Sequence, residues 1–163
     1  MPVQVFVSGG SNIDAVTNIR NAVAGLRGEF GELSLSSVYR SPAVGFDGED
    51  FLNIIIGFVT DRSASDCAGV MNALESASGR TDAQRGFTAR PLDLDMVLYG
   101  DLVDGSPELR VPRDDVTEYP FVLGPLAEIA PDFRHPVTGE TMADMWRGFD
   151  RSNLTMTVEQ GVI

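Results

Sequence analysis

Two aspartates in an otherwise apolar stretch are the side chains of this chain best placed for chemistry. Asp93 and Asp95 alternate with apolar residues between 92 and 96, and residues 97–99 continue without a charge. Strict alternation predicts a β-strand, which places both carboxylates on one face about 7 Å apart. Carboxylates so close raise each other's pKa unless a cation neutralises them, and their oxygens are ligands that suit Mg²⁺. Arg90 lies three residues before Asp93, and an arginine beside a metal-binding pair favours chemistry on a phosphate chain.

A strand whose acidic face is simply exposed to water is the alternative interpretation of Asp93 and Asp95. Aspartate is a poor strand former, however. Here it recurs in the most apolar strand of its half of the chain. We therefore favour a metal site over an exposed polar face.

Length and composition predict one globular domain over residues 1–163. The chain is 43% hydrophobic and 22% charged, as is usual for a folded domain of this size. It lacks an apolar run long enough for a membrane span, and its N-terminus lacks a basic secretory signal. Cys67 is the single cysteine, which excludes internal disulfides and cysteine-rich zinc sites. These features lead us to expect a cytoplasmic protein with no membrane partner.

The charged residues argue against several classes of function. The formal net charge is −12, which disfavours a nucleic-acid partner because phosphate neutralisation requires clustered cations. All 12 basic residues are arginines and there is 1 histidine. Without lysine, lysine-based catalysis and a Walker loop are excluded, and a single histidine disfavours a Ser-His-Asp relay. Arginines do gather in one stretch, which suggests a local anion site. They are Arg80, Arg85, Arg90, Arg110 and Arg113.

Hydrophobic periodicity predicts the elements that must position these side chains. Alternating or continuous apolar runs indicate strands, and spacings of three and four between apolar residues indicate helices. The strands are predicted at residues 3–8, 33–40, 51–60 and 92–99. The helices are predicted at residues 13–26, from Ser63 or Ser65 to near Gly79, and at residues 119–130.

The order β-α-β-β-α-β is that of the split βαβ, ferredoxin-like arrangement. This α+β fold has a mostly antiparallel sheet with both helices on one face, and we expect the other face to be available for a ligand. An appended C-terminal helical portion follows residue 119, with Trp146 in a short helix and a loose end from Asp150. Residues 80–89 have no apolar period and are predicted to form a mobile loop that closes over bound substrates.

Two short polar features leave alternatives open. Gly9-Gly10-Ser11-Asn12 follows the first predicted strand, and it forms either a tight turn, which we favour, or a backbone cradle for phosphate. Asn53 lies near the start of an apolar run. It is either a strand-end residue that faces water or an amide that binds a ligand.

Several short motifs recur in a familiar order along nearly the whole chain to Trp146. They are Gly10-Ser11-Asn12, Tyr39-Arg40-Ser41-Pro42, Phe51-Leu52-Asn53, Gly79-Arg80, Arg90-Pro91-Leu92-Asp93-Leu94-Asp95, Val111-Pro112 and Pro125-Leu126-Ala127-Glu128-Ile129-Ala130-Pro131. In these motifs the chain resembles the 6-hydroxymethyl-7,8-dihydropterin pyrophosphokinase family of folate biosynthesis. The resemblance implies Mg²⁺-dependent transfer of the diphosphate of ATP to the hydroxymethyl group of the dihydropterin, with release of AMP. It also implies two Mg²⁺ ions, ATP and a dihydropterin as partners, and a monomer.

The resemblance further implies roles for individual side chains. Asp93 and Asp95 correspond to the family's Mg²⁺ ligands, and Arg80 and Arg90 to arginines that handle the phosphates during transfer. Asp95 or water would accept the proton of the hydroxyl group. Glu75 matches a carboxylate behind the pocket, and we group it with the nucleotide-binding residues. The implied pterin site consists of Ser41, Ala43, Val44, Phe51, Asn53, Phe87 and Phe121.

Departures from the family pattern fall on the nucleotide side. Arg113-Asp114 stands where His-Tyr is familiar, and Tyr119 replaces an arginine. Arg110 and Arg113 are expected to bind the nucleotide and to restore positive charge. A second hypothesis is therefore a paralogue that binds pterin or nucleotide with weak or lost transfer activity. A third, an interaction domain of the same fold with an incidental acidic pair, is disfavoured because Arg80, Arg90 and Asn53 occur together with the acidic pair.

Overall fold

The computed structural model describes residues 2–43, 48–79, 91–152 and 154–163. Strands and helices alternate in the first part of the chain, and short helices and a last strand follow. In chain order the elements are β1 (Val3–Ser11), α1 (Ala15–Phe30), β2 (Ser34–Leu35), β3 (Val38–Ser41), β4 (Phe51–Thr60), α2 (Ala64–Ala77), β5 (Asp93–Tyr99), α3 (Asp115–Glu118), α4 (Pro120–Ile129), α5 (Met142–Arg147) and β6 (Thr157–Glu159).

The strands form one antiparallel sheet with β1 and β4 at its centre. The order is β5-β1-β4-β3-β6, and β2 also pairs with β4. Each pairing among the described strands is antiparallel. The predicted α+β class, with a mostly antiparallel sheet, is confirmed.

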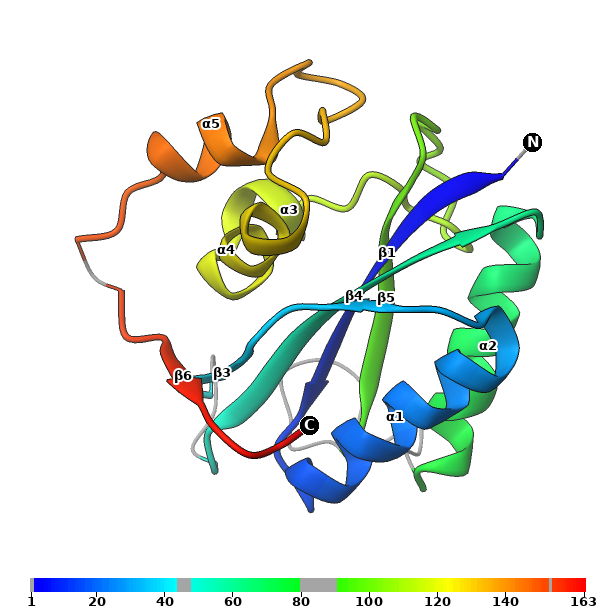
Figure 1. The fold of residues 1–163 in the computed structure, drawn as a ribbon, viewed down its shortest axis with the longest axis vertical. Coiled ribbons are helices and arrows are strands. Elements are labelled where there is room, and N and C mark those ends of the chain that lie inside the picture. The colour runs from blue at the N-terminus through cyan, green and yellow to red at the C-terminus, as the bar shows by residue number, and fades with distance from the viewer. Residues whose placement is uncertain (1, 44–47, 80–90, 153) are drawn as a thin grey trace.

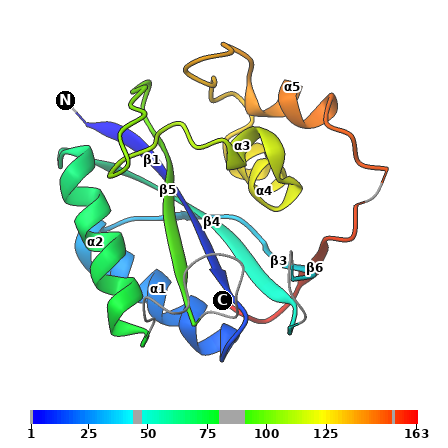
Figure 2. The same ribbon diagram turned by 180° about the vertical axis from the view of Figure 1, so that it is seen from behind.

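Helices α1 and α2 lie on one face of the sheet, as both views show (Figures 1 and 2). α1 buries Ile19 and Leu26, which lie seven residues apart on one side of the helix. Met71 of α2 joins the same core, as do Ile54 and Ile56 of β4. The two helices are held there by apolar burial, which stabilises by about 25 cal/mol for each Å² removed from water.

The opposite face, which we expected to be available for a ligand, is partly covered by α4 and α5 (Figure 1), so only part of it is accessible. Phe6 and Ile55 pack there against Leu123 and Leu126 of α4. The physical reason lies in β4, which is buried at every position from residue 52 to 58. A strand that is apolar on both faces requires cover on both faces.

The chain after Asp150 does not form the loose end that we expected. β6 pairs with β3 at the edge of the sheet, and Val162 is 3% exposed within the core beneath α1 and α2. Arg20 of α1 donates to the carbonyls of Gly161 (3.0 Å) and Val162 (2.5 Å). The missed signal was a strand of only three residues, too short for periodicity to reveal.

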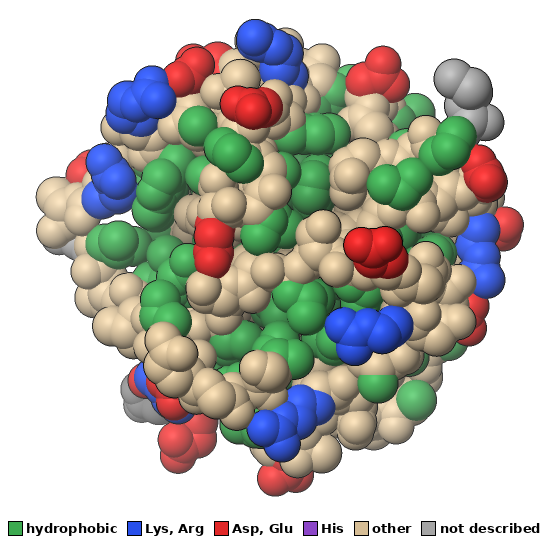
Figure 3. Space-filling view, viewed as in Figure 1, with side chains coloured by type: hydrophobic (Ala, Val, Ile, Leu, Met, Phe, Trp, Pro, Cys, Tyr) green, Lys and Arg blue, Asp and Glu red, His purple; other side chains and the backbone are tan. Residues whose placement is uncertain are grey.

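Charges are dispersed on the surface seen in Figure 3. Arg side chains stand apart from one another there, while hydrophobic side chains gather nearer the middle of the view. Within the described ranges, no helix is both long and apolar enough to cross a membrane.

Candidate active site

Three adjacent strands place Asn53, Gly10 and Asp93 in one row across the sheet. Gly10 of β1 lies opposite Asn53 of β4 on one side and opposite Asp93 of β5 on the other. Directly opposed residues in antiparallel strands point to the same face. Neighbouring strands lie about 4.8 Å apart, so roughly 10 Å separates the backbone of Asn53 from that of Asp93.

The next row along the same face identifies which face this is. Ser8 lies between Ile55 and Asp95, and Ile55 packs against the core beneath α4. The two aspartates therefore share a face, as the alternation predicted. This face is the one covered by α4. Gly10, Asp93 and Asp95 on it are partly exposed to solvent. The site lies where the cover provided by α4 ends.

Gly10 forms a floor without a side chain between the amide and the acids. The glycines of the Gly9-Gly10-Ser11-Asn12 segment lie within β1, which extends to Ser11, so the predicted turn is wrong for them. A Cβ at Gly10 would lie 3.5 Å from Asn53 Oδ1 and 3.9 Å from Phe51 Cδ1. These are ordinary contacts, so packing within the protein does not require glycine here. The absence of a side chain leaves room for a ligand instead.

The amide of Asn53 is oriented by β3. Asn53 is 5% exposed, and its Nδ2 donates to Ser41 Oγ (2.7 Å) and to the backbone carbonyl of Tyr39 (3.3 Å). Both donor positions of the amide are thus used within the protein, which leaves Oδ1, on the side of Gly10, to accept from a ligand. The structure favours the acceptor role alone.

The acidic side of the site disfavours the ionised form of Asp95. Burial, and next the charge of Asp93, raise the pKa of Asp95 to about 7, while Arg113 opposes this shift. Glu75 and Asp115 raise the same pKa further. Glu75 Oε2 also accepts a hydrogen bond from the backbone N–H of Leu94 (2.8 Å), between the two aspartates. Glu75 therefore helps to hold β5, the edge strand that carries the pair.

Arg113 is the cation nearest to Asp95 among the described residues, and it is held loosely. Its Nη1 lies 3.9 Å from Asp95 Oδ1, and its Nε lies 3.7 Å from Asp115 Oδ1. Neither distance is that of a hydrogen bond. Its Nε is also the one buried side-chain nitrogen or oxygen in the described part of the chain without a hydrogen-bond partner. An orphaned donor beside acids indicates that Arg113 can take an additional anionic partner.

A cavity of about 210 Å³ adjoins this group along the outer edge of β5. It is lined by α2, β5 and the segment before α3, and it brings together side chains that sequence analysis assigned to nucleotide and metal. Its polar lining consists of Asn72, Glu75, Asp93, Asp95, Glu108, Arg110 and Arg113.

The donor set suits Mg²⁺ that is only partly held by protein. In the described ranges, no three His, Cys, Asp or Glu side chains are grouped closely enough to form a complete metal site. Mg²⁺ commonly binds through one or two carboxylates and completes its shell with water and substrate phosphates. Asp93 and Asp95 match that pattern, and burial together with the charge of Asp93 raises the pKa of Asp95, which a bound cation would offset.

Comparison with known families agrees with this geometry. Residues 6–131 match the family described as 7,8-dihydro-6-hydroxymethylpterin-pyrophosphokinase (HPPK). The chain belongs to this family. The predicted enzyme class, a pyrophosphokinase of folate biosynthesis, is thereby confirmed.

Individual relatives support the assignment. A 2-amino-4-hydroxy-6-hydroxymethyldihydropteridine pyrophosphokinase of Synechocystis is 34% identical over 137 residues, which cover 78% of this chain and 70% of the relative. One from Aquifex aeolicus is 32% identical over 136 residues, covering 82% and 84%. The fold is similar to that of Plasmodium falciparum HPPK-DHPS, with a TM-score of 0.68 and 11% identity over 90% of this chain. This pyrophosphokinase spans 44% of that longer chain.

The structure brings together part of the predicted site of this pyrophosphokinase. Asp93, Asp95, Glu75, Arg110 and Arg113 line one cavity. Asn53 and Phe51 lie beside Gly10, and Ser41 contacts the Asn53 amide. Phe121, in the first turn of α4, stacks on Tyr119 with ring centroids 5.1 Å apart, and Ala43 ends a described segment. Val44, Arg80, Phe87 and Arg90 lie outside the described residues, as does the predicted loop 80–89.

Sequence reasoning missed Glu128 as a residue that supports the site. Its carboxylate accepts hydrogen bonds from Ser37 N (3.1 Å), Ser37 Oγ (2.6 Å) and Tyr39 OH (2.8 Å). Burial first, and next the bond to Glu128, raise the pKa of Tyr39 to about 12. Glu128 thus fastens α4, which carries Phe121, to β3, which carries Ser41. Its position within the Pro125–Pro131 motif could have identified Glu128 from the sequence.

Gly10→Ala is expected to weaken pterin binding without harming the fold. The methyl group would stand on the floor between Asn53 and Asp93, whereas alanine in a strand is favoured over glycine by about 0.5–1 kcal/mol. We expect an unchanged or higher melting temperature and a loss of pterin affinity of about tenfold, since overpacking a site costs about 1–3 kcal/mol. Calorimetry with a pterin analogue measures the affinity.

Gly9→Ala is the matched control for Gly10→Ala. Its Cβ would point into the core, 3.2 Å from Ile54 Cγ2, and would lower the melting temperature instead. Equal pterin affinity in Gly10→Ala and the wild type would contradict the placement of the floor.

Binding of Mg²⁺ to this pyrophosphokinase is expected to release a proton below neutral pH. The pKa of Asp95 is about 7 without metal, so below that pH a proton competes with the ion. Apparent affinity should fall about tenfold for each pH unit below 7 and level off above about 8. Titration calorimetry in two buffers of different ionisation enthalpy measures the released proton. The same affinity at pH 6 and pH 8 would argue against Asp95 as a ligand.

Proposed function

We propose that this protein transfers the diphosphate of ATP to the hydroxymethyl group of 6-hydroxymethyl-7,8-dihydropterin and releases AMP. The observation that carries the proposal is the row Asn53–Gly10–Asp93, which sets a buried amide acceptor across a glycine floor from the acidic pair. The amide side suits the N–H groups at the edge of a flat pterin. The acidic side suits a metal-bound phosphate chain.

The pterin subsite is proposed to lie around Asn53, Ser41 and Phe51, with Ala43, Val44, Phe87 and Phe121 completing it. Asn53 accepts from the ring edge, because its own donors are held by Ser41 and Tyr39. Phe51 offers an aromatic side chain beside the floor, where ring-to-ring packing favours a planar ligand. The strand order β5-β1-β4-β3, with α1 and α2 on one face, supports a ferredoxin-like core that carries this site, with α3, α4 and α5 as its appended helical portion.

Asp93 and Asp95 are proposed to bind two Mg²⁺ ions, as the resemblance to the family implies. When bound, Mg²⁺ would screen the charge of ATP so that a neutral hydroxyl group can approach. Glu75 holds the strand between the two ligands through Leu94 N–H. Arg110 and Arg113 line the adjoining cavity and are proposed to bind the nucleotide. Arg80 and Arg90 are proposed, from family membership, to hold the phosphates during transfer.

A monomer is proposed as the active unit, as the resemblance to the family implies. ATP and the dihydropterin are the proposed partners, and the buried thiol of Cys67 suits the reducing cytoplasm that we propose as its location.

A test of the activity combines purified protein, Mg²⁺, ATP and 6-hydroxymethyl-7,8-dihydropterin and measures AMP. Formation of AMP together with the pterin diphosphate is the expected result. The second candidate function, a binding paralogue with lost transfer, is motivated by Arg113, which departs from the family pattern and lies near Asp95 and Asp115. Pterin binding without AMP would support that candidate. Absence of both binding and AMP would overturn both.

A further inference from the structure

The last strand of the chain comes from outside the part that matches the family. The match ends at residue 131, whereas β6 spans Thr157–Glu159. β6 lies on the outer side of β3, with Val38 opposite Glu159 and Arg40 opposite Thr157. Both views show this strand at the edge of the sheet beside β3 (Figures 1 and 2).

β3 is a short strand whose register relative to β4 matters for the site. It pairs with β4 from Tyr39, opposite Asn53, to Ser41, opposite Phe51. The backbone carbonyl of Tyr39 and the hydroxyl group of Ser41 are the two acceptors that orient the Asn53 amide. A shift of one residue in β3 would turn every side chain to the other face. The acceptor geometry of Asn53 therefore depends on the register of β3.

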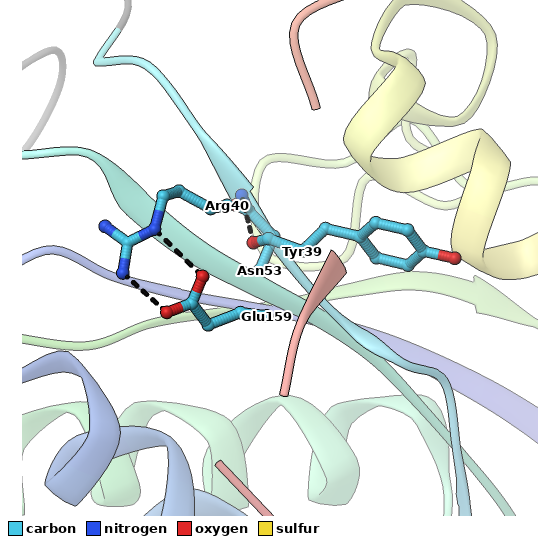
Figure 4. A network of polar contacts seen from close by, with 4 residues as sticks. All are labelled: Tyr39, Arg40, Asn53 and Glu159. Carbon is cyan, nitrogen blue, oxygen red and sulfur yellow. Dashed lines mark hydrogen bonds and ion pairs between the residues drawn. The ribbon is translucent and has the colours of Figure 1, made fainter. Parts of the chain in front are cut away.

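β6 is fastened to β3 and to α1 by side chains as well as by strand pairing. Arg40 forms two parallel bonds to Glu159, from Nε to Oε2 (3.1 Å) and from Nη2 to Oε1 (3.0 Å). Arg20 holds the carbonyls of Gly161 and Val162. Figure 4 shows Arg40 paired with Glu159 of β6 and, next to Arg40 on β3, Tyr39, whose carbonyl accepts from Asn53.

We propose that the C-terminal segment 154–163 positions the pterin subsite, with Arg40 and Glu159 as positioning residues. β6 turns β3 from an edge strand into an interior strand and so holds Tyr39 and Ser41 against Asn53. Edge strands of a few residues open locally at low free energy, and pairing on both sides suppresses that opening. The proposal rests on the proposed function, because it concerns how tightly the pterin is bound.

The nucleotide side provides an internal reference. The cavity beside β5 is lined by residues of α2, β5 and the segment 107–113, and β1 and β4 separate β5 from β3 in the sheet. Loosening β3 should therefore weaken binding of pterin but not of nucleotide. A general loss of folding would weaken both.

Charge reversal in the full-length protein tests the proposal. Arg40→Glu is expected to weaken binding of 6-hydroxymethylpterin about threefold, as suits the loss and reversal of a partly exposed pair. The double variant Arg40→Glu/Glu159→Arg should restore the wild-type affinity. Binding of a non-hydrolysable ATP analogue with Mg²⁺ should be unchanged in both. Calorimetry measures both ligands.

Arg62→Glu is the matched control, because Arg62 forms a similarly exposed pair with Glu29 (2.9 Å) that involves neither β3 nor β6. It should bind the pterin as the wild type does. Deletion of residues 154–163 should weaken pterin binding about tenfold, with an unchanged affinity for the ATP analogue.

The outcomes separate the two proposals. A wild-type protein that binds no pterin would overturn the proposed function. Pterin binding by the wild type with no change in Arg40→Glu, or with equal losses for pterin and nucleotide, would overturn the role of β6. If the deletion variant does not fold, the pterin affinity of Arg40→Glu/Glu159→Arg tests the proposal instead. Failure of this double variant to recover the wild-type affinity would overturn the role of β6.

Discussion

Asp95→Asn is expected to lower transfer activity by at least about 10³-fold while making the metal-free protein more stable at pH 8. The loss of activity follows from removal of a metal ligand, since a bound ion contributes several kcal/mol to stabilising the transferring phosphates. The gain in stability follows from the pKa of Asp95, about 7 in the folded protein, against about 3.9 in an unfolded chain. Folding therefore disfavours the ionised form.

The pH dependence of this gain has a definite sign. The folded-state pKa is raised, so the penalty is fully present above about pH 7 and disappears as the pH falls through the folded and then the unfolded pKa. Asparagine cannot ionise and escapes the penalty. Because the Asp95 side chain is 29% exposed, solvent screening reduces the effect, and we expect a gain of about 2 kcal/mol at pH 8 and none near pH 4.

Chemical denaturation of the metal-free proteins at pH 4 and pH 8 measures this difference. Asp104→Asn is a suitable control, because hydrogen bonds from Ser106 lower the pKa of Asp104 and its loss should not stabilise the protein. If Asp95→Asn gains no stability at pH 8 relative to pH 4, folding does not raise the pKa of Asp95. If it unfolds, the acidic pair is structural.

Asn53→Ala is expected to weaken pterin binding by about 1–3 kcal/mol, or roughly 5- to 150-fold, with little change in the affinity for ATP. The substitution removes the acceptor that faces Gly10. It also leaves the carbonyl of Tyr39 and the hydroxyl group of Ser41 without the donor that each now has. A buried donor on the pterin edge would then be unpaired, which is the larger part of the loss.

Ser41→Ala separates the two contributions to Asn53→Ala. It removes one partner of the amide but leaves Oδ1 and the bond to Tyr39, so its effect should be the smaller of the two. Calorimetry with a pterin analogue, and with an ATP analogue as reference, measures both variants. An unchanged pterin affinity in Asn53→Ala would place the subsite away from the row across β4, β1 and β5.

The sequence by itself determined the elements and the faces within them. Alternation between 92 and 96 placed Asp93 and Asp95 on one face of a strand, and α1 and α2 follow from apolar spacings of three and four. Short ordered motifs identified the family. Each of these properties is local: a side chain's direction within a strand or helix depends on the backbone period alone. Local patterns were wrong where the segment was short, at β6, or where glycines continued a strand, at Gly9 and Gly10.

Only the tertiary structure decided what faces these residues across the sheet. The row Asn53–Gly10–Asp93, the orientation of the Asn53 amide by Tyr39 and Ser41, and the position of Arg113 between Asp95 and Asp115 join segments far apart in the chain. Strand register and the partial burial that raises the pKa of Asp95 arise from packing between elements. A side chain's chemistry in the site depends on its neighbours in space, and a local period specifies its direction but not those neighbours.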